Sequence, residues 1–432
     1  MLQEYKCPCC DGGLIFDTKT QKMKCPYCDS VFDVASLREY DTVLDAGQEN
    51  RTQHHTWSEG EMAGLRSYVC KSCGGQIIGD ETLAASKCPY CNNPIVMMGQ
   101  FAGDLRPDCI IPFQLDKTAA KEGLKEHMSG RPLLPKVFIS ENHIDEIKGI
   151  YVPFWLYDTD VDASINYNAT KVHHWSDEDY DYTETEYYDV YRQGCIAFDN
   201  VPVDGSKKID DALMESIEPY EFCQATDFQT AYLAGYMADK YDIGLEASLP
   251  RARHRIQVST EDAFRSTVMG YNTVYTSHSD IQMRDDSAKY ALYPVWLLNT
   301  TWNSERYRFA MNGQSGKFVG NLPIDKGRAL AWHGGWTIAF TVICYFLLNY
   351  LQGRMDSDIL SSYYPIFSIV IGILLGICVI HSMIAEMRNV RMQHGAANYV
   401  RPGSMVVNSS YDRFLYSHVT KTPRPKANRK DD

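Results

Sequence analysis

Two long stretches in the last third of the sequence contain no charged side chain. Residues 329–353 and residues 359–385 lack Asp, Glu, Lys and Arg. A helix needs about 20 apolar residues to cross a bilayer, and both stretches are long enough. Aromatic side chains lie near their ends, where they favour the membrane interface, at Trp332, Trp336, Tyr350, Tyr363 and Tyr364. We predict a two-helix transmembrane hairpin over residues 330–385, and the alternative is a buried helical hairpin.

The middle of the chain, residues 104–325, has the pattern of a mixed α+β domain. Segments 148–159 and 289–300 share the frame K-x4-P-x-W-L-x-[DN]-T at an offset of 141 residues. Both are rich in aromatic and β-branched residues, which favour strands. The proline in each predicts a strand start or an edge. Residues 161–203 alternate polar and apolar side chains, as strands do, and the repeat leaves open whether this domain is duplicated.

Helix signals precede each copy of this repeat. Asp116 is suited to cap the start of a helix. Residues 227–240 carry an apolar stripe at helical spacing, and Ser259 to Asp262 resembles a capping box that opens another helix. A hairpin turn is expected at Asn312-Gly313 or Ser315-Gly316.

The N-terminal region contains a repeat of cysteine pairs at an offset of 63 residues. Each copy has a CxxC pair, fourteen intervening residues and a second CxxC pair. We predict two zinc ribbons, at residues 1–40 and 67–103, joined by a polar linker at residues 41–66. The predicted metal ligands are Cys7, Cys10, Cys25, Cys28, Cys70, Cys73, Cys88 and Cys91.

Four thiolates close a tetrahedral site, and zinc prefers this ligand set in proteins. A closed site leaves no position for a catalytic water, so we expect two structural Zn²⁺ ions. Metal binding would supply the folding energy that a ribbon of about 25 residues cannot obtain from its small core. Iron in a rubredoxin-like site and redox-active cysteine pairs are the alternatives. Cys9 could replace Cys10 in the first pair, although the repeat favours Cys10.

The charges divide the chain into an acidic body and a basic tail. The formal net charge is -13, whereas residues 385–432 hold nine Lys/Arg and four Asp/Glu. The overall acidity disfavours a broad nucleic-acid-binding surface. The basic tail, residues 386–432, would suit the anionic cytoplasmic face of a bilayer, or it would be solvated and partly disordered.

The distribution of basic residues also predicts the topology. The loop between the two apolar stretches holds one basic residue, Arg354, and each outer flank holds three. The positive-inside rule therefore places both termini in the cytoplasm. We expect no secretory signal, and paired CxxC units at ribbon spacing are typical of a reducing compartment.

Other candidate sites are weaker. Residues 312–318 superficially resemble a phosphate loop but lack its spacing, so a turn is the better interpretation. The pairs His54-His55 and His173-His174 have no metalloprotease context and are expected at the surface. The acidic and aromatic run from Asp177 to Asp189 is expected to be a solvated hairpin, with a cation or a basic partner as the alternative. We predict no catalytic residue.

The order of these motifs resembles a family of bacterial zinc-ribbon membrane proteins. The resemblance rests on the paired CPYC ribbons, the Tyr-Val-Pro-Phe-Trp and Tyr-Pro-Val-Trp segments, the Asn312–Lys317 turn and the C-terminal hairpin. Members are often labelled as transcription-factor-IIB-type zinc ribbons or as replication factor Y-like. The resemblance implies association with envelope-stress components, such as phage-shock-type or flotillin-like membrane proteins.

We therefore expect a non-enzymatic adaptor or scaffold that binds protein partners at the cytoplasmic face of the cell membrane. The alternative is a membrane-tethered nucleic-acid-binding or regulatory protein. Residues 1–100 hold nine Lys/Arg and thirteen Asp/Glu, which argues against that alternative. An enzyme with its site between the two tryptophan segments is a third hypothesis.

Overall fold

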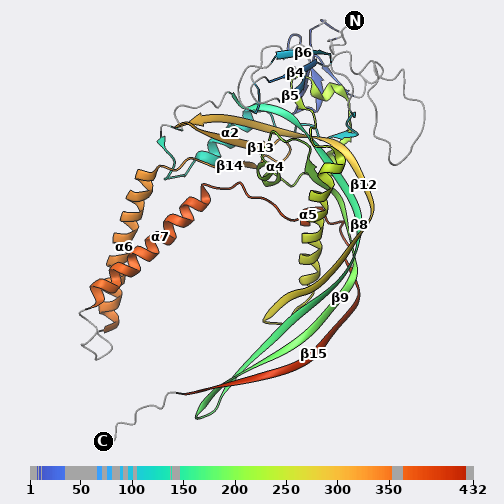
Figure 1. Cartoon of the computed structure of the whole chain (residues 1–432). Helices are drawn as coiled ribbons and strands as arrows, with labels where there is room; N and C mark the ends of the chain where they lie inside the picture. The colour runs from blue at the N-terminus through green and yellow to red at the C-terminus, as the bar shows by residue number, and fades with distance from the viewer. Residues whose placement is uncertain are drawn as a thin grey trace, which may run out of the picture.

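The computed structural model describes residues 7, 9, 10, 12–34, 66–70, 75–79, 88–90, 96–100, 105–136, 138, 146–352 and 363–424. A small sheet lies near the N-terminus, beside one end of a large curved sheet, and two helices project from the same body (Figure 1). This is the mixed α+β fold that the sequence predicts. Except for Arg66, the predicted linker lies outside the described residues.

The small sheet belongs to the first ribbon. Its antiparallel strands are β1 (Ile15–Asp17), β2 (Lys22–Lys24) and β3 (Val31–Phe32). Phe16 and Met23 are cross-strand partners, and both are buried. The ring of Phe16 packs edge-on against Tyr232, with 5.2 Å between the ring centroids. The ribbon is therefore docked on the body by its own core side chain.

Within the part of the chain that the structure describes, the large sheet has twelve strands. They are β4 (Arg66–Val69), β5 (Gln76–Gly79), β6 (Val96–Gln100), β7 (Cys109–Ile110), β8 (Lys148–Ser176), β9 (Tyr180–Asp204), β10 (Thr226–Asp227), β11 (Met237–Asp239), β12 (Thr273–Trp302), β13 (Glu305–Asn312), β14 (Phe318–Gly320) and β15 (Val406–Pro423). Strand β5, from the second cysteine repeat, pairs with β11. The strands around the second repeat thus continue the large sheet.

A local two-fold axis relates the two tryptophan segments. Strands β8 and β12 pair antiparallel, with Val152 opposite Tyr293, and these two residues are 141 positions apart. Strand β11 pairs parallel with Ile150 and Tyr151 of β8. Strand β7 pairs parallel with Ala291 and Leu292 of β12, which are the equivalent residues of the second copy.

Equivalent hydrogen bonds recur on both sides of this axis. The indole Nε1 of Trp155 donates to Ile243 O at 2.8 Å, and that of Trp296 donates to Leu115 O at 3.1 Å. A glycine amide in each half also donates to the carbonyl oxygen of the repeat's proline. Gly205 donates to Pro153 O and Gly313 donates to Pro294 O, both at 2.8 Å. The weak sequence repeat therefore corresponds to two structural units, each with a short strand, a helix and a long strand.

The two prolines lie inside central strands, so the prediction of a strand start or edge is wrong. On the side of β8 away from β12, pairing with β11 ends at Tyr151 and pairing with β9 begins at Phe154. Pro153 lies in this gap. Proline has no backbone N–H, and at this position the sheet loses no hydrogen bond because of it. Pro294 lies in the equivalent gap between β7 and β13.

The predicted helices are partly confirmed. Helix α2 (Lys117–Met128) begins after Asp116, whose carboxylate accepts the Ala119 amide at 2.8 Å. Helix α5 (Leu245–Arg265) begins well before the expected capping box. Ser259 is inside this helix and accepts a hydrogen bond from the Ala396 amide instead of capping a helix start.

The stripe in residues 227–240 does not form a helix, and this prediction is wrong. These residues contain the 3-10 turn η5 (Thr230–Leu233), a positive φ of 85° at Gly235 and then β11. Phe228, Ala231 and Leu233 are nevertheless buried. Their spacing reflects a compact segment packed on the core, and pairing with β5 and β8 draws its end into the sheet.

Strands β12, β8, β9 and β15 extend beyond the body as a long curved sheet, which we call the blade (Figure 1). The predicted alternation over residues 161–203 is confirmed, because Val161, Ile165 and Tyr167 are buried on the face that α5 covers. The opposite face is more exposed. From His173 to Ser176 both faces of β8 are exposed.

The two apolar stretches form helices α6 (Lys326–Gln352) and α7 (Tyr364–Glu386). Both helices are long and apolar enough to cross a membrane, and few of their residues are buried. Gly372 and Gly376 of α7 face α6, because a Cβ atom added at either position would meet Thr341 or Thr337. The loop that contains Arg354 lies outside the described residues.

The chain after α7 returns along the body. We call residues 387–401 the strap. Its backbone is held by α4 (Asp211–Ser216) and α5: the Arg391 amide donates to Ser216 Oγ at 2.8 Å, and the Gln393 amide donates to Glu215 Oε2 at 2.7 Å. Helix α5 contributes Arg255, whose guanidinium donates to Gly395 O and to the buried carboxylate of Glu218.

The strap leads into β15, which pairs antiparallel with β9 along almost its whole length. The alternative of a disordered tail is therefore wrong for residues 406–423. All side chains of β15 are exposed. The strand is instead held by its ladder with β9 and by cross-strand contacts, such as the 2.6 Å ion pair between Arg192 and Asp412.

Candidate metal centre

The first ribbon carries its cysteines on two tight turns. The Cys7 amide donates to Gly12 O at 2.7 Å, and the Cys25 amide donates to Ser30 O at 2.9 Å. Both bonds therefore close loops with the same five-residue spacing. Gly12 lies against the ring of Tyr27, where a Cβ atom would be only 2.5 Å from the ring. The absence of a side chain at Gly12 allows the two turns to approach each other.

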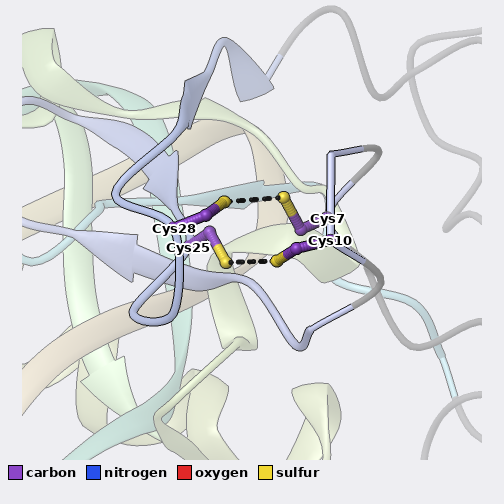
Figure 2. Close-up of side chains that lie close together, drawn as sticks. All are labelled: Cys7, Cys10, Cys25 and Cys28. Atoms are coloured by element: carbon purple, nitrogen blue, oxygen red, sulfur yellow. Dashed lines mark hydrogen bonds between the residues drawn. The ribbon is translucent and has the colours of Figure 1, made fainter.

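The four predicted ligands of this ribbon come together. The Sγ atoms of Cys7, Cys10, Cys25 and Cys28 all lie within 4.8 Å of one another. Figure 2 shows the pairs Cys7–Cys28 and Cys10–Cys25, each with 3.4 Å between the sulfur atoms. Tetrahedral zinc with Zn–S bonds of about 2.3 Å needs sulfur atoms about 3.8 Å apart. The donor set and its dimensions therefore fit a metal ion such as zinc.

The thiols strongly affect one another's ionisation. The Gly12 backbone acts to lower the pKa of Cys10, but the neighbouring thiols of Cys25 and Cys28 raise it to about 12. Hydrogen bonds from the side chain and backbone of Ser30 lower the pKa of Cys28 to about 6. One thiolate forms easily, and further ionisation in the same cluster needs a cation to offset the repulsion.

The structure selects Cys10 over Cys9. The side chain of Cys9 is exposed and is not part of the cluster. Its amide instead donates to Cys7 Sγ at 3.4 Å. Backbone amides that point at sulfur stabilise the thiolate form, so Cys9 supports the site through its backbone.

The second cysteine repeat, which is predicted to form a ribbon, is described in part. Cys70 and Cys88 are buried, whereas Cys73 and Cys91 lie outside the described residues. The Cys70 amide donates to Gly75 O at 2.9 Å, as Cys7 does to Gly12. The Tyr90 amide donates to Cys88 Sγ at 3.4 Å, as the Cys9 amide does to Cys7. The two described cysteines thus have the local turn geometry of the first ribbon.

Contacts that sequence patterns did not reveal hold the first ribbon and the second cysteine repeat on the body. Gln21 Nε2 donates to Phe113 O at 2.8 Å, and Lys19 pairs with Asp116 at 3.1 Å. In the second cysteine repeat, Tyr90 is buried, and Lys208 lies over its ring while forming an ion pair with buried Asp239. The CPYC tyrosine is a visible signal in the sequence, but its partners lie more than a hundred residues away.

The remaining sequence candidates stay separate from this centre. His173 lies 3.6 Å from Glu186, and His174 contacts Thr183, both on the exposed end of the blade. Residues 54 and 55 lie outside the described part. Among the described residues, the cluster in the first ribbon is the group of three or more His, Cys, Asp or Glu side chains close enough to hold a metal ion.

The turn between β13 and β14 is confirmed. The Gly316 amide donates to Asn312 O at 2.9 Å, and Gly316 has a φ of 81°. The Asn312 side chain accepts the amides of Gln314 and Ser315. These side-chain bonds satisfy the turn internally, and the Lys317 ammonium donates to Glu218 O. The segment therefore supports the turn interpretation over a phosphate loop.

Together, the fold and the site define a mixed α+β protein with a four-cysteine cluster suited to a metal and two helices able to cross a membrane. The chain is 33% identical over 335 residues to the uncharacterized protein YdjG of Bacillus subtilis (strain 168). The aligned region covers 78% of this chain and 94% of that relative, and the chain belongs to the YdjG family. No family model matches the sequence, and no solved structure matches it.

Proposed function

We propose that this protein is a non-enzymatic, membrane-anchored adaptor whose metal-bound ribbons and blade bind protein partners at the cytoplasmic face. The observation that carries the proposal is a four-cysteine site docked on a body that continues into two apolar helices. A closed site supports a structural role for the metal. A surface that is rigid before binding loses less entropy when a partner docks.

The anchor is a two-helix hairpin in this proposal, with both termini in the cytoplasm. Strand β9 precedes α6, whereas β15 follows α7, and the two strands pair with each other. Such pairing requires both strands to lie on one side of the bilayer, which supports an even number of crossings. The Leu322 amide also donates to Met387 O at 2.9 Å, which ties the two ends of the hairpin together.

Each chain would bind two structural Zn²⁺ ions. The matching turns at Cys7 and Cys70 support a second site like the first. The ligands of this second ion would be Cys70, Cys73, Cys88 and Cys91.

The first partners to test are phage-shock-type and flotillin-like membrane proteins, as the family resemblance suggests. The protein would be purified from its native membranes in mild detergent, and co-purifying proteins would be identified by mass spectrometry. We expect a reproducible protein partner that is retained with Cys9→Ser and lost with the double variant Cys7→Ser/Cys28→Ser. Recovery of nucleic acid alone, with salt-dependent retention, would replace the adaptor with the regulatory alternative.

A further inference from the structure

The blade has two sheet edges that no strand of the described chain covers. On one edge, β15 pairs only with β9 within the described residues. On the other edge, residues 273–284 of β12 pair only with β8 among the described strands, because β7 and β13 join β12 further along. A free edge presents unpaired backbone N–H and C=O groups to any strand of suitable direction. The edge on β15 also exposes apolar side chains, such as Phe414 and Val419.

We propose that these two edges pair with each other between copies of this chain, head to tail, so that the blade continues from one molecule to the next. The strand directions allow this pairing. Strand β12 is antiparallel to β8, and β15 is antiparallel to β9 and therefore parallel to β8. Without any reversal, β15 of one copy lies antiparallel to β12 of its neighbour.

Among the described side chains of the two edges, charge favours one register. Arg413 of β15 and Asp280 of β12 both lie on the face of the blade away from α5, because their ladders place them in line with Asn168 and Ser164 of β8. Antiparallel pairing of Arg413 with the neighbour's Asp280 brings opposite charges together across the new contact. Both side chains are exposed, and Arg413 already lies 2.8 Å from Asp189 of its own chain.

The same register is consistent on the other face. It places Val419 opposite Val274 of the neighbour, and both belong to the face towards α5. Each strand has one bulge within this interval, between Phe414 and Tyr416 on β15 and between Thr276 and His278 on β12. Because a bulge shifts the alternation of side chains by one residue, one bulge on each strand keeps the two faces in phase.

If two copies paired with each other through their β15 strands, Arg413 would not meet an acidic side chain. Asp412 is the one acidic residue of β15. It lies on the face towards α5, where Arg192 and Tyr271 bind it. Arg413 therefore finds an acidic partner when β15 pairs with β12 of a neighbour, but not when β15 pairs with the neighbour's β15. Head-to-tail contacts are heterologous, so they build rings or open filaments instead of closed dimers.

The test is the self-association of the full-length protein in detergent, measured by analytical ultracentrifugation. Arg413→Asp and Asp280→Arg should each weaken association about tenfold, because one attraction becomes a repulsion. An equal mixture of the two variants should restore association, since the aspartate introduced on β15 of one variant can then face the arginine introduced on β12 of the other. Arg306→Asp, with the same charge change on the exposed part of β13, should have no effect.

A monomer at all concentrations would overturn the proposal. So would variants that remain folded and each weaken association but are not rescued by mixing, because the complementary charges at positions 413 and 280 then do not meet across the contact. A disulfide between Val419→Cys on one copy and Val274→Cys on another provides a second test. If these cysteine variants still associate but do not form the disulfide, the register is wrong. Zinc content and partner recovery are measured separately, so failure here leaves the adaptor proposal intact.

Discussion

The four cysteines of the first ribbon act as one unit because each sulfur lies close to the other three. The CxxC spacing identified all four, since each tight turn brings two thiols together. The sequence favoured Cys10 through the repeat and left Cys9 as an alternative, and the path of the turn confirms Cys10. The pattern also could not identify Ser30, which shifts the ionisation of Cys28, because a serine beside a cysteine carries no distinctive spacing.

Replacement of one ligand should therefore remove one metal ion. We expect Cys7→Ser to lower the bound metal by one ion per chain and to expose the first ribbon to protease. The stabilisation lost locally is on the order of 10 kcal/mol, as for other structural zinc sites. Metal content by mass spectrometry provides the measurement. Cys9→Ser is the matched control, and a loss of zinc in that variant would contradict the assignment.

Arg255 holds the strap through a buried ion pair. Its guanidinium and the Glu218 carboxylate are both almost fully buried. Arg255→Met would leave the Glu218 charge buried without a partner, which typically costs about 3–5 kcal/mol of stability. We expect a lower denaturant midpoint and faster proteolysis within residues 387–401. The double variant Arg255→Met/Glu218→Leu should recover much of the loss, and exposed Arg265→Met on the same helix should change little.

At the level of secondary structure, the apolar patterns predicted the long helices and strands well, and the short elements poorly. The uncharged runs became α6 and α7, and the alternation at residues 161–203 became β8 and β9. The failures at residues 227–240 and at Ser259 have one cause. Local spacing does not reveal that a segment will pair with a distant strand or bind a distant backbone group, as β11 and Ser259 do.

The glycines of α7 provide a test of the hairpin. Gly372→Leu would drive a side chain into Thr341 and the α6 backbone. Overpacking of this kind costs about 1–3 kcal/mol, so we expect a lower melting temperature in detergent. Gly335→Leu on α6 is the control, because a Cβ atom there meets nothing within 4 Å. Equal effects of both substitutions would show that α7 does not pack on α6 through Gly372.

At the scale of the whole molecule, the tryptophan repeat of the sequence indicated two related units but not how they combine. Their exchange of short strands, β7 onto β12 and β11 onto β8, joins them into one sheet. The two halves then diverge. Strand β9 continues for 25 residues into the blade, whereas β13 has 8 residues and leads through β14 towards the helices. No local pattern predicts which half is extended, because that choice depends on pairing with β15.

The pairing of β9 with β15, which precede and follow the two apolar helices in the sequence, gives a further prediction. Tyr191 and Tyr411 are cross-strand partners whose stacked rings have centroids 5.1 Å apart. Tyr191→Cys with Tyr411→Cys should form an intramolecular disulfide in native membranes under mild oxidation. Tyr187→Cys with Tyr411→Cys, which is displaced along the ladder, should form far less. A cross-link that appears only after detergent extraction would place the two strands on opposite sides of the bilayer.

The separation of β9 and β15 along the chain also sets the order in which the protein is made. About 200 residues are synthesised after β9 before its partner strand emerges, which takes on the order of 10–40 s at ordinary rates of translation. During that interval the ribosome has already delivered both apolar helices, while one edge of β9 is still open. The sheet therefore cannot be completed before β15 has emerged, and a product that ends before residue 406 keeps an unpaired strand that chaperones or proteases can recognise.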